Sequence, residues 1–407
     1  MHLSLACSLI CSIVSNAIPE PQLQDWVVSA GQTRTYNTAS GPLRLGSLRI
    51  EAGGVLHVVG PNALDLKVSN VVEVFGTLDL SGNHSFGVLT LNTTNQPEHG
   101  MRGGPGAGVG GTGSKLTNAN TPSGEPGLDN GGQTLGGGGG ETGFSTLGKE
   151  ARRPAGGGGG AFASDQPEVL NPLDPANDGL IASAGWDGSA TGLGAISQST
   201  LAQGGAVGAR LFNDLLADND FWGQKASPAG TITGELLAPE GGRGGGAGGD
   251  AVDAPAFPAA TFTPFGDEKG SAGGGGGGLG LVLTRRFVLG AEGRVLANGG
   301  HGGGGENTLF FDRVGGGSGG GSGGMLVIEA LVMDLTDATP GALSARGGVG
   351  GFGRNNQPLV VGAGGDGGPG LIQLHIPSAG QLLLPAGFSL DDVSAPNAHV
   401  LLPILGL

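Results

Sequence analysis

Runs made almost entirely of glycine are the feature of this sequence that most constrains how it can fold. They stand at residues 136–140, 156–160, 273–278, 302–305 and 315–324, and the last run contains two serines. The sequence between neighbouring runs is often too short to form a core, so a linker would have no domains to join. We therefore expect the glycines where one backbone passes close to another and a Cβ atom would not fit. Extended glycine segments can pair through main-chain N–H···O and Cα–H···O bonds. Loose loops on a β core are the alternative.

Short segments of alternating apolar and polar residues lie between residues 26 and 92. Examples are 43–45, 48–50, 64–68 and 78–80. This period of two places the aliphatic side chains on one face of a strand, and glycine and asparagine interrupt the segments at turns. Aromatic residues make up 4% of the chain, so the core must be aliphatic. Closely spaced strands of this kind are typical of a solenoid, sandwich or barrel.

An internal repeat connects the glycine runs with the strands. Apolar segments beginning at Leu281, Leu326 and Leu371 each follow a glycine-rich stretch and are spaced 45 residues apart. A second element ends in Gly-Gly at residues 295–300 and 342–348. The repeating unit is therefore a glycine run, a strand, a turn, a second strand and a further excursion.

Four regions follow from these patterns. We expect a signal peptide at 1–17, N-terminal β-rungs at 18–100, glycine-rich rungs with long loop insertions at 101–270, and C-terminal β-rungs with the repeat of 45 residues at 271–407.

The first region resembles an export signal. Leu3–Val14 is an apolar run that is too short to span a membrane, and Ser15 and Ala17 are small residues at the positions that a signal peptidase reads. Basic residues are missing before the run, so a first buried strand or helix is the alternative. Cleavage after Ala17 would remove both cysteines, Cys7 and Cys11, and leave no disulfide chemistry.

Composition and charge exclude several classes of protein. The chain has 91 glycines among 407 residues, yet its hydrophobic fraction is 37% and its charged fraction 13%, which is unlike a disordered chain. The net charge of −15 argues against a partner that is a nucleic acid or an anionic membrane. We expect neither nucleic-acid binding nor an integral membrane span.

One motif has the form of a calcium-binding nonapeptide. Residues 245–253 read GGAGGDAVD, and a degraded copy stands at 362–366. This motif would make Asp250, Asp253 and Asp366 calcium ligands. Tandem copies are needed to share each ion, and these lie 116 residues apart, so the sequence predicts no strong dependence on calcium and no required cofactor.

Catalytic patterns are sparse. No two of the seven histidines have metal-ligand spacing, and His57 and His375 alternate with aliphatic residues, as outward-facing strand residues do. No nucleophile elbow or phosphate-binding loop stands in the required context, so we expect no catalytic residues. The pairs Arg285–Arg286 and Asp334/Asp337 are the only candidates for carbohydrate chemistry.

Aliphatic rungs, Leu-x-Ala-x-Gly-Gly endings and GGGSGG-type runs together resemble the glycine-rich parallel β-helix proteins that bacteria export. The glycine runs also resemble, more weakly, the polyglycine-rich tips of phage tail-fibre adhesins. The resemblance implies a right-handed parallel β-helix, a solenoid with long glycine-rich loops and little helix.

The same resemblance implies a non-enzymatic secreted or cell-surface protein with a structural or adhesive role. Its expected partners are surface polysaccharide or other copies of itself. The alternative is a carbohydrate-active β-helix enzyme, a polysaccharide lyase or hydrolase. Two carboxylates within about 10 Å on one rung face would favour that enzyme.

Overall fold

The computed structural model describes most of the strand and glycine-rich segments of the chain. The described residues are 23–87, 98–113, 124–140, 143–145, 156–162, 191–193, 201–202, 204–209, 212, 219–253, 267–268, 270–305, 315–351, 353–354 and 360–404. The predicted signal peptide at 1–17, with Cys7 and Cys11, lies outside them. No helix in these ranges is long and apolar enough to cross a membrane.

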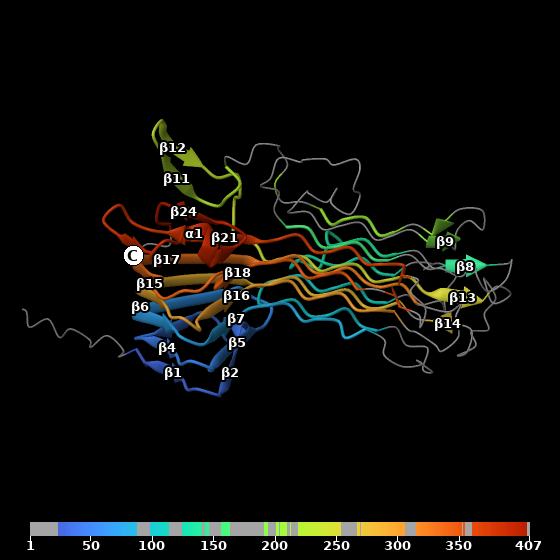
Figure 1. Ribbon diagram of the computed structural model, residues 1–407, viewed down its shortest axis with the longest axis horizontal. Helices are drawn as coiled ribbons and strands as arrows, with labels where there is room; N and C mark the ends of the chain where they lie inside the picture. Colours follow the sequence, from blue (N-terminus) through green and yellow to red (C-terminus); the bar gives the residue numbers. More distant parts are fainter. Residues whose placement is uncertain are drawn as a thin grey trace, which may run out of the picture.

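Two parallel sheets form one half of the molecule (Figure 1). The larger has the order β1-β4-β6-β15-β17-β21-β24, with β3 paired to β6 and β22 to β17. Its strands are β1 (Trp26–Val28), β3 (Leu43–Leu45), β4 (Leu48–Ile50), β6 (Leu64–Val74), β15 (Leu279–Leu289), β17 (Met325–Asp334), β21 (Leu371–His375), β22 (Gln381–Leu383) and β24 (Ala398–Leu401). The smaller has the order β2-β5-β7-β16-β18-β23. Its strands are β2 (Thr33–Asn37), β5 (Val55–Val59), β7 (Thr77–Asp79), β16 (Arg294–Leu296), β18 (Leu343–Ser344) and β23 (Ser394–Ala395).

The chain alternates between these sheets. Strands β4, β6, β15 and β17 of the larger sheet are each followed by a strand of the smaller one, namely β5, β7, β16 and β18. Parallel neighbours cannot be joined by a tight hairpin, and the strand in the opposite sheet supplies the necessary crossover. Both sheets contribute to one aliphatic core, for example Leu66 and Val74 from β6 and Leu56 and Leu78 from the smaller sheet.

The sequence repeat coincides with strand pairing, displaced by one residue. Leu279 pairs with Met325 and Met325 with Leu371, so paired residues lie 46 positions apart rather than 45. A shift of one residue exchanges the two faces of a strand. As a result Leu326 is buried in the core, whereas Leu281 lies on the opposite face of the sheet.

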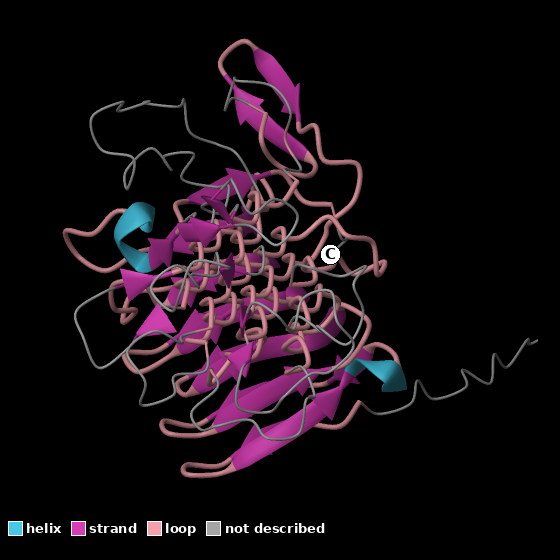
Figure 2. Ribbon diagram, turned by 90° about the vertical axis from the view of Figure 1, so that its right-hand side faces the viewer, coloured by secondary structure: helices cyan, strands magenta, loops and turns pink. Residues whose placement is uncertain are grey.

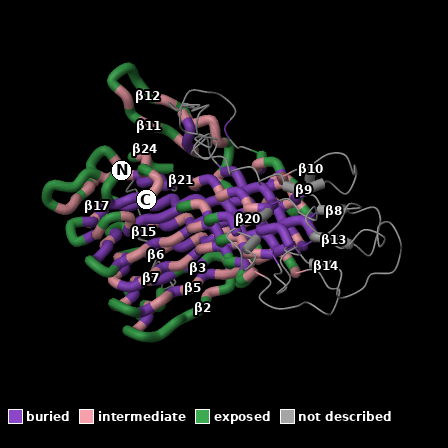
Figure 3. The backbone as a smooth tube through the Cα atoms, turned by 45° about the vertical axis from the view of Figure 1, so that its right-hand side comes forward, coloured by how far each residue is buried: buried purple, intermediate pink, exposed green. Residues whose placement is uncertain are grey.

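Glycine-rich segments form the other half of the molecule. We call them the glycine bundle; they are residues 98–113, 124–140, 156–162, 204–209, 241–250, 270–278, 297–305, 315–324, 345–351 and 362–370. They run side by side from the two sheets toward β8 (Gly143–Ser145), β9 (Thr191–Leu193), β13 (Ala251–Asp253) and β14 (Asp267–Glu268) at the far end (Figure 1). Figure 2 views the bundle from that end, and Figure 3 shows that much of it is buried.

The hydrogen bonds of residues 315–324 repeat every three residues. Successive amides donate in turn to three neighbouring segments, and every third amide returns to the same one. Amides 316, 319 and 322 donate to carbonyls 249, 246 and 243; amides 317, 320 and 323 to carbonyls 362, 365 and 368; and amides 318, 321 and 324 to carbonyls 303, 300 and 297. Three residues per turn is the period of the polyproline II helix, which has no internal hydrogen bonds.

Carbonyls of the same segment accept from three other segments, within residues 156–162, 270–278 and 345–351. Six neighbours therefore surround residues 315–324, and the segment lies at the centre of the bundle.

Close approach explains why these residues are glycine. A Cβ atom built on Gly319 would lie 1.9 Å from the carbonyl oxygen of Gly158, and one on Gly320 would lie 2.0 Å from that of Gly348. Both neighbours are backbone atoms, which cannot move aside as a side chain can. The prediction that glycines stand where backbones meet is confirmed for this run, and the loose-loop alternative is wrong for it.

The remaining elements are small. Antiparallel pairs join β9 to β10 (Leu201–Ala202), β11 (Gln224–Ser227) to β12 (Gly230–Thr233), β13 to β14, and β19 (Gly353–Arg354) to β20 (Val360–Val361); β8 pairs with β13 in parallel. Helical structure in the described ranges is a 3-10 turn, η1 (Thr38–Ser40), and the four-residue helix α1 (Leu390–Val393). The expectation of a nearly all-strand protein with parallel sheets and little helix is confirmed.

Candidate functional site

A pocket of about 340 Å³ lies where the smaller sheet meets the glycine bundle. We call it the histidine pocket; it is lined by His57, Asp79, Ser81, Gly82, Asn83, His84, Phe86 and Met101. Its residues come from two neighbouring strands, from the chain that leaves β7, and from the bundle segment 98–113.

Strand pairing places the first two residues of the histidine pocket. His57 of β5 and Asp79 of β7 are direct partners in the parallel ladder, so their side chains leave the same face of the sheet. His57 Nδ1 lies 3.2 Å from Asp79 Oδ2, and Asp79 Oδ1 accepts a hydrogen bond of 3.0 Å from the Ser81 amide. Because a carboxylate only accepts, Nδ1 of His57 carries the proton in this contact, and Nε2 is an acceptor when the ring is neutral.

Three of the four residues from 83 to 86, in the chain beyond β7, are exposed. Asn83 and His84 are exposed, Ser85 is buried, and Phe86 is 82% exposed. An aromatic ring this open gains nothing from the core, so the fold itself does not require it.

A second histidine stacks on His84. His301 occupies the equivalent place after β16, and the two rings lie 4.5 Å apart between centroids at an angle of 13°. The His301 amide donates to His84 Nδ1 at 2.9 Å, and the Val349 amide donates to His301 Nδ1 at 2.8 Å. A backbone amide can only donate, so both Nδ1 atoms are unprotonated and His84 carries its proton on Nε2.

Burial lowers the pKa of His84, and the neighbouring His301 lowers it further, although Asp79 acts in the opposite direction. The neutral ring is therefore the form that this geometry favours. It offers a donor at Nε2 in the pocket that also holds the Asp79 carboxylate.

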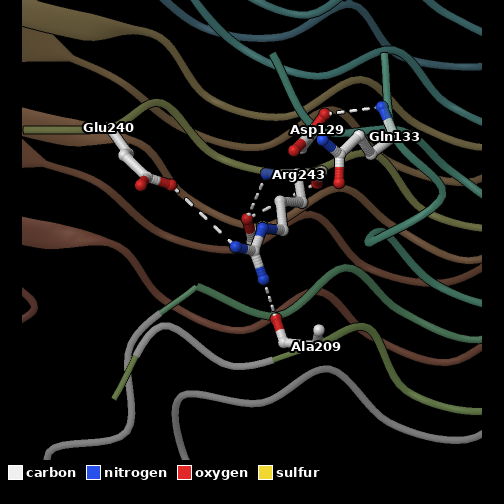
Figure 4. A network of polar contacts seen from close by, with 6 residues as sticks. Asp129, Gln133, Ala209, Glu240 and Arg243 are labelled. Atoms are coloured by element: carbon white, nitrogen blue, oxygen red, sulfur yellow. Dashed lines mark hydrogen bonds and ion pairs between the residues drawn. The ribbon is translucent and has the colours of Figure 1, made fainter. Parts of the chain in front are cut away.

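A second pocket, of about 280 Å³, carries two carboxylates. Asp129, Asn130 and Glu240 line it, and the buried Arg243 lies between the two acids (Figure 4). Arg243 Nη2 is 3.9 Å from Glu240 Oε2, its Nη1 donates to the Ala209 carbonyl, and Asp129 Oδ1 accepts from the Gln133 amide at 2.7 Å. Burial lowers the pKa of Arg243, while Glu240 and Asp129 oppose that shift.

Two of the candidate calcium ligands, Asp250 and Asp366, accept hydrogen bonds from the backbone of the bundle. Asp250 is buried, and its Oδ1 accepts from the Gly270 amide at 2.8 Å. Asp366 Oδ1 accepts from the Gly350 amide at 2.7 Å, and Asp253 is the last residue of β13. Within the described ranges, no group of three or more His, Cys, Asp or Glu side chains is placed to hold a metal ion.

The four candidate residues for carbohydrate chemistry lie in different surroundings. Arg286 pairs with Asp334 across β15 and β17 at 2.8 Å, and Asp337 is exposed in the turn that follows. Arg285 lines a different pocket, with Arg44 and Lys67. The four residues are therefore not one site.

Comparison with protein-family models, with curated proteins and with solved structures gives no match to this chain. The function has to be argued from the geometry alone.

Sequence reasoning missed the histidine pocket. His57 and Asp79 are 22 residues apart, and His84 and His301 are 217 apart. One signal was available: His84 stands six residues after Leu78 and His301 six residues after Val295, and these two strand residues pair. Aligning the two strands at these residues would have predicted that His84 lies beside His301.

Proposed function

We propose that this protein is a non-enzymatic secreted or cell-surface protein with a structural or adhesive role. The observation that carries the proposal is the central glycine segment, which is hydrogen-bonded to six neighbours with a period of three. A body held by main-chain bonds and excluding side chains is suited to bearing load and presenting surfaces.

The alternation of the chain between two parallel sheets supports the finer assignment of a right-handed parallel β-helix. The proposal also keeps the resemblance to exported glycine-rich β-helix proteins of bacteria, and less closely to phage tail-fibre adhesins. A surface polysaccharide or another copy of the chain is the proposed partner.

The proposal is tested in the native host. We expect the protein in the extracellular or surface fraction, with a mature N-terminus near Ile18, and we expect the purified protein to adhere to isolated cell-surface polysaccharide. Fractionation, N-terminal sequencing and a sedimentation assay measure these outcomes. An intact Met1 on protein found only inside the cell would contradict the surface assignment.

The second candidate is a polysaccharide lyase or hydrolase, and one observation favours it. Asp129 and Glu240 line one pocket, as the two carboxylates of a glycosidase do. Arg243 Nη2, however, lies 3.9 Å from Glu240 Oε2, so this carboxylate is engaged in an ion pair. Release of reducing ends or unsaturated sugars that disappears in both Asp129→Asn and Glu240→Gln would establish the enzyme instead.

A further inference from the structure

The histidine pocket has the chemistry of a sugar-binding site. Sugar hydroxyls both donate and accept, and a pyranose ring has a face of C–H groups that packs on aromatic rings. A site for such a ligand needs donors and acceptors side by side and one open aromatic surface.

The polar groups of the pocket supply both kinds of partner. Asp79 has one hydrogen bond on each carboxylate oxygen, from Ser81 and His57, which leaves further lone pairs on both. The Nδ1 atoms of both histidines are engaged, which leaves Nε2 of each ring for a ligand, and Nε2 of His84 carries a proton and donates. Exposed Asn83 adds an amide that donates and accepts.

The apolar surface is Phe86. Its ring lines the same pocket and is 82% exposed, so a ligand that covers it removes apolar area from water. An aromatic ring beside the Asp79 carboxylate matches neither a phosphate nor another anion. The carboxylate of Asp79 and the net charge of −15 repel such ligands.

We propose that the histidine pocket binds one neutral hexopyranose unit of a polysaccharide, with Phe86 against the sugar ring and with Asp79, Asn83, His57 and His84 on its hydroxyls. This inference rests on the proposed adhesive function and names the ligand class of the site.

Neutral oligosaccharides test the inference directly. The full-length chain is titrated by calorimetry with cellohexaose, laminarihexaose, mannohexaose and chitohexaose. We expect saturable binding of at least one of them. Phe86→Ala and Asp79→Asn should each weaken that binding about tenfold or more. The first removes the aromatic face under the sugar ring, and the second removes the carboxylate that accepts from its hydroxyls.

Matched substitutions control for unspecific effects. Phe388, which is 40% exposed and outside the pocket, should tolerate Phe388→Ala without loss of binding, and Phe86→Trp should keep binding by retaining an aromatic face. Asn83→Ala, inside the pocket, should weaken binding, and denaturation midpoints verify that every variant is folded.

Two results would overturn the inference. One is that no sugar of the panel binds; the other is that binding is unchanged in Phe86→Ala and Asp79→Asn. If either occurs while the protein still adheres to surface polysaccharide, the pocket assignment fails and the adhesive function stands. If adhesion is also lost, both fail.

Discussion

At the scale of single residues, the central segment of the bundle shows which side chains the packing admits. Serine replaces glycine at 318 and 322, and both hydroxyls act as backbone partners. Ser318 Oγ accepts from the Gly303 amide at 2.9 Å and donates to the Ala272 carbonyl at 2.5 Å, and Ser322 Oγ accepts from the Arg243 amide at 2.8 Å. Each serine thus satisfies an amide that the bundle would otherwise leave unpaired.

Gly320→Ala should lower the free energy of unfolding by about 1–3 kcal/mol, the usual cost of overpacking. The new methyl would meet the Gly348 backbone at 2.0 Å, and that backbone is itself fixed by hydrogen bonds. Urea denaturation of both proteins measures the difference.

Gly131→Ala is the matched control. Gly131 lies in an exposed turn, and a Cβ atom there would approach only the Asp129 side chain, at 3.4 Å. Its effect should stay within about 0.5 kcal/mol. Equal stability of Gly320→Ala and the wild type would mean that the backbone around Gly320 has room for a methyl group.

At the scale of elements, the outer face of the larger sheet is covered at its β17–β21 end. Glu329 pairs with His375 and Val327 with Gln373 in the ladder, and all four side chains are buried. Gln373 Nε2 donates to the Trp222 carbonyl, His375 Nδ1 to the Leu402 carbonyl, and the Ile404 amide donates to Glu329 Oε2. These bonds attach the segment before β11 and the residues after β24 to the sheet. His375 is outward-facing as predicted, but it is covered.

Acidification should weaken this attachment through His375. Burial lowers the pKa of His375, although the Leu402 carbonyl and Glu329 act in the opposite direction, and its Nε2 has no partner in the described structure. The folded protein therefore holds the ring neutral while the unfolded chain protonates near pH 6.5. The stabilisation is complete above about pH 6.5 and is lost as the pH falls below it, by at most about 1.4 kcal/mol per pH unit.

Denaturation between pH 7.5 and 5.5 measures that loss. His375→Asn keeps a donor for Leu402 and cannot titrate, so its stability should fall less than that of the wild type. His99→Asn, at an exposed position, should keep the wild-type slope. Parallel curves for all three proteins would show that His375 does not control the pH dependence.

At the scale of the whole molecule, the sheets and the glycine bundle are one continuous hydrogen-bonded body. The Met325 amide donates to the Gly278 carbonyl and the Leu371 amide to the Gly324 carbonyl, so the pairing of glycine segments passes directly into the pairing of β15, β17 and β21. The positions of the glycine segments 270–278, 315–324 and 362–370 are therefore set by the strands that follow them.

A body held in this way should not need calcium. Asp250 and Asp366 already accept backbone amides, and their motifs lie far apart in sequence. Adding a chelator should move the thermal midpoint by less than about 10 °C, whereas a tightly bound ion stabilises the folded state strongly. A larger fall, restored by calcium but not by magnesium, would make these aspartates ligands.

The sequence alone determined the local features of this protein. Alternating segments such as 43–45 and 64–68 became strands with their aliphatic side chains in the core, because a period of two sorts residues between two faces. The glycine runs became close-packed backbone, because only glycine lacks the Cβ atom that such contacts exclude.

Only the tertiary structure decided which segments are neighbours. Glycine runs have no side chains to distinguish one partner from another. The register of β15 and β21 with β17 places segments 270–278 and 362–370 beside residues 315–324, and the runs themselves do not. The same register stacks His84 on His301, and the packing of the bundle brings Asp129 near Arg243. These contacts join residues far apart in the chain, and a sequence pattern with a short period carries no information about them.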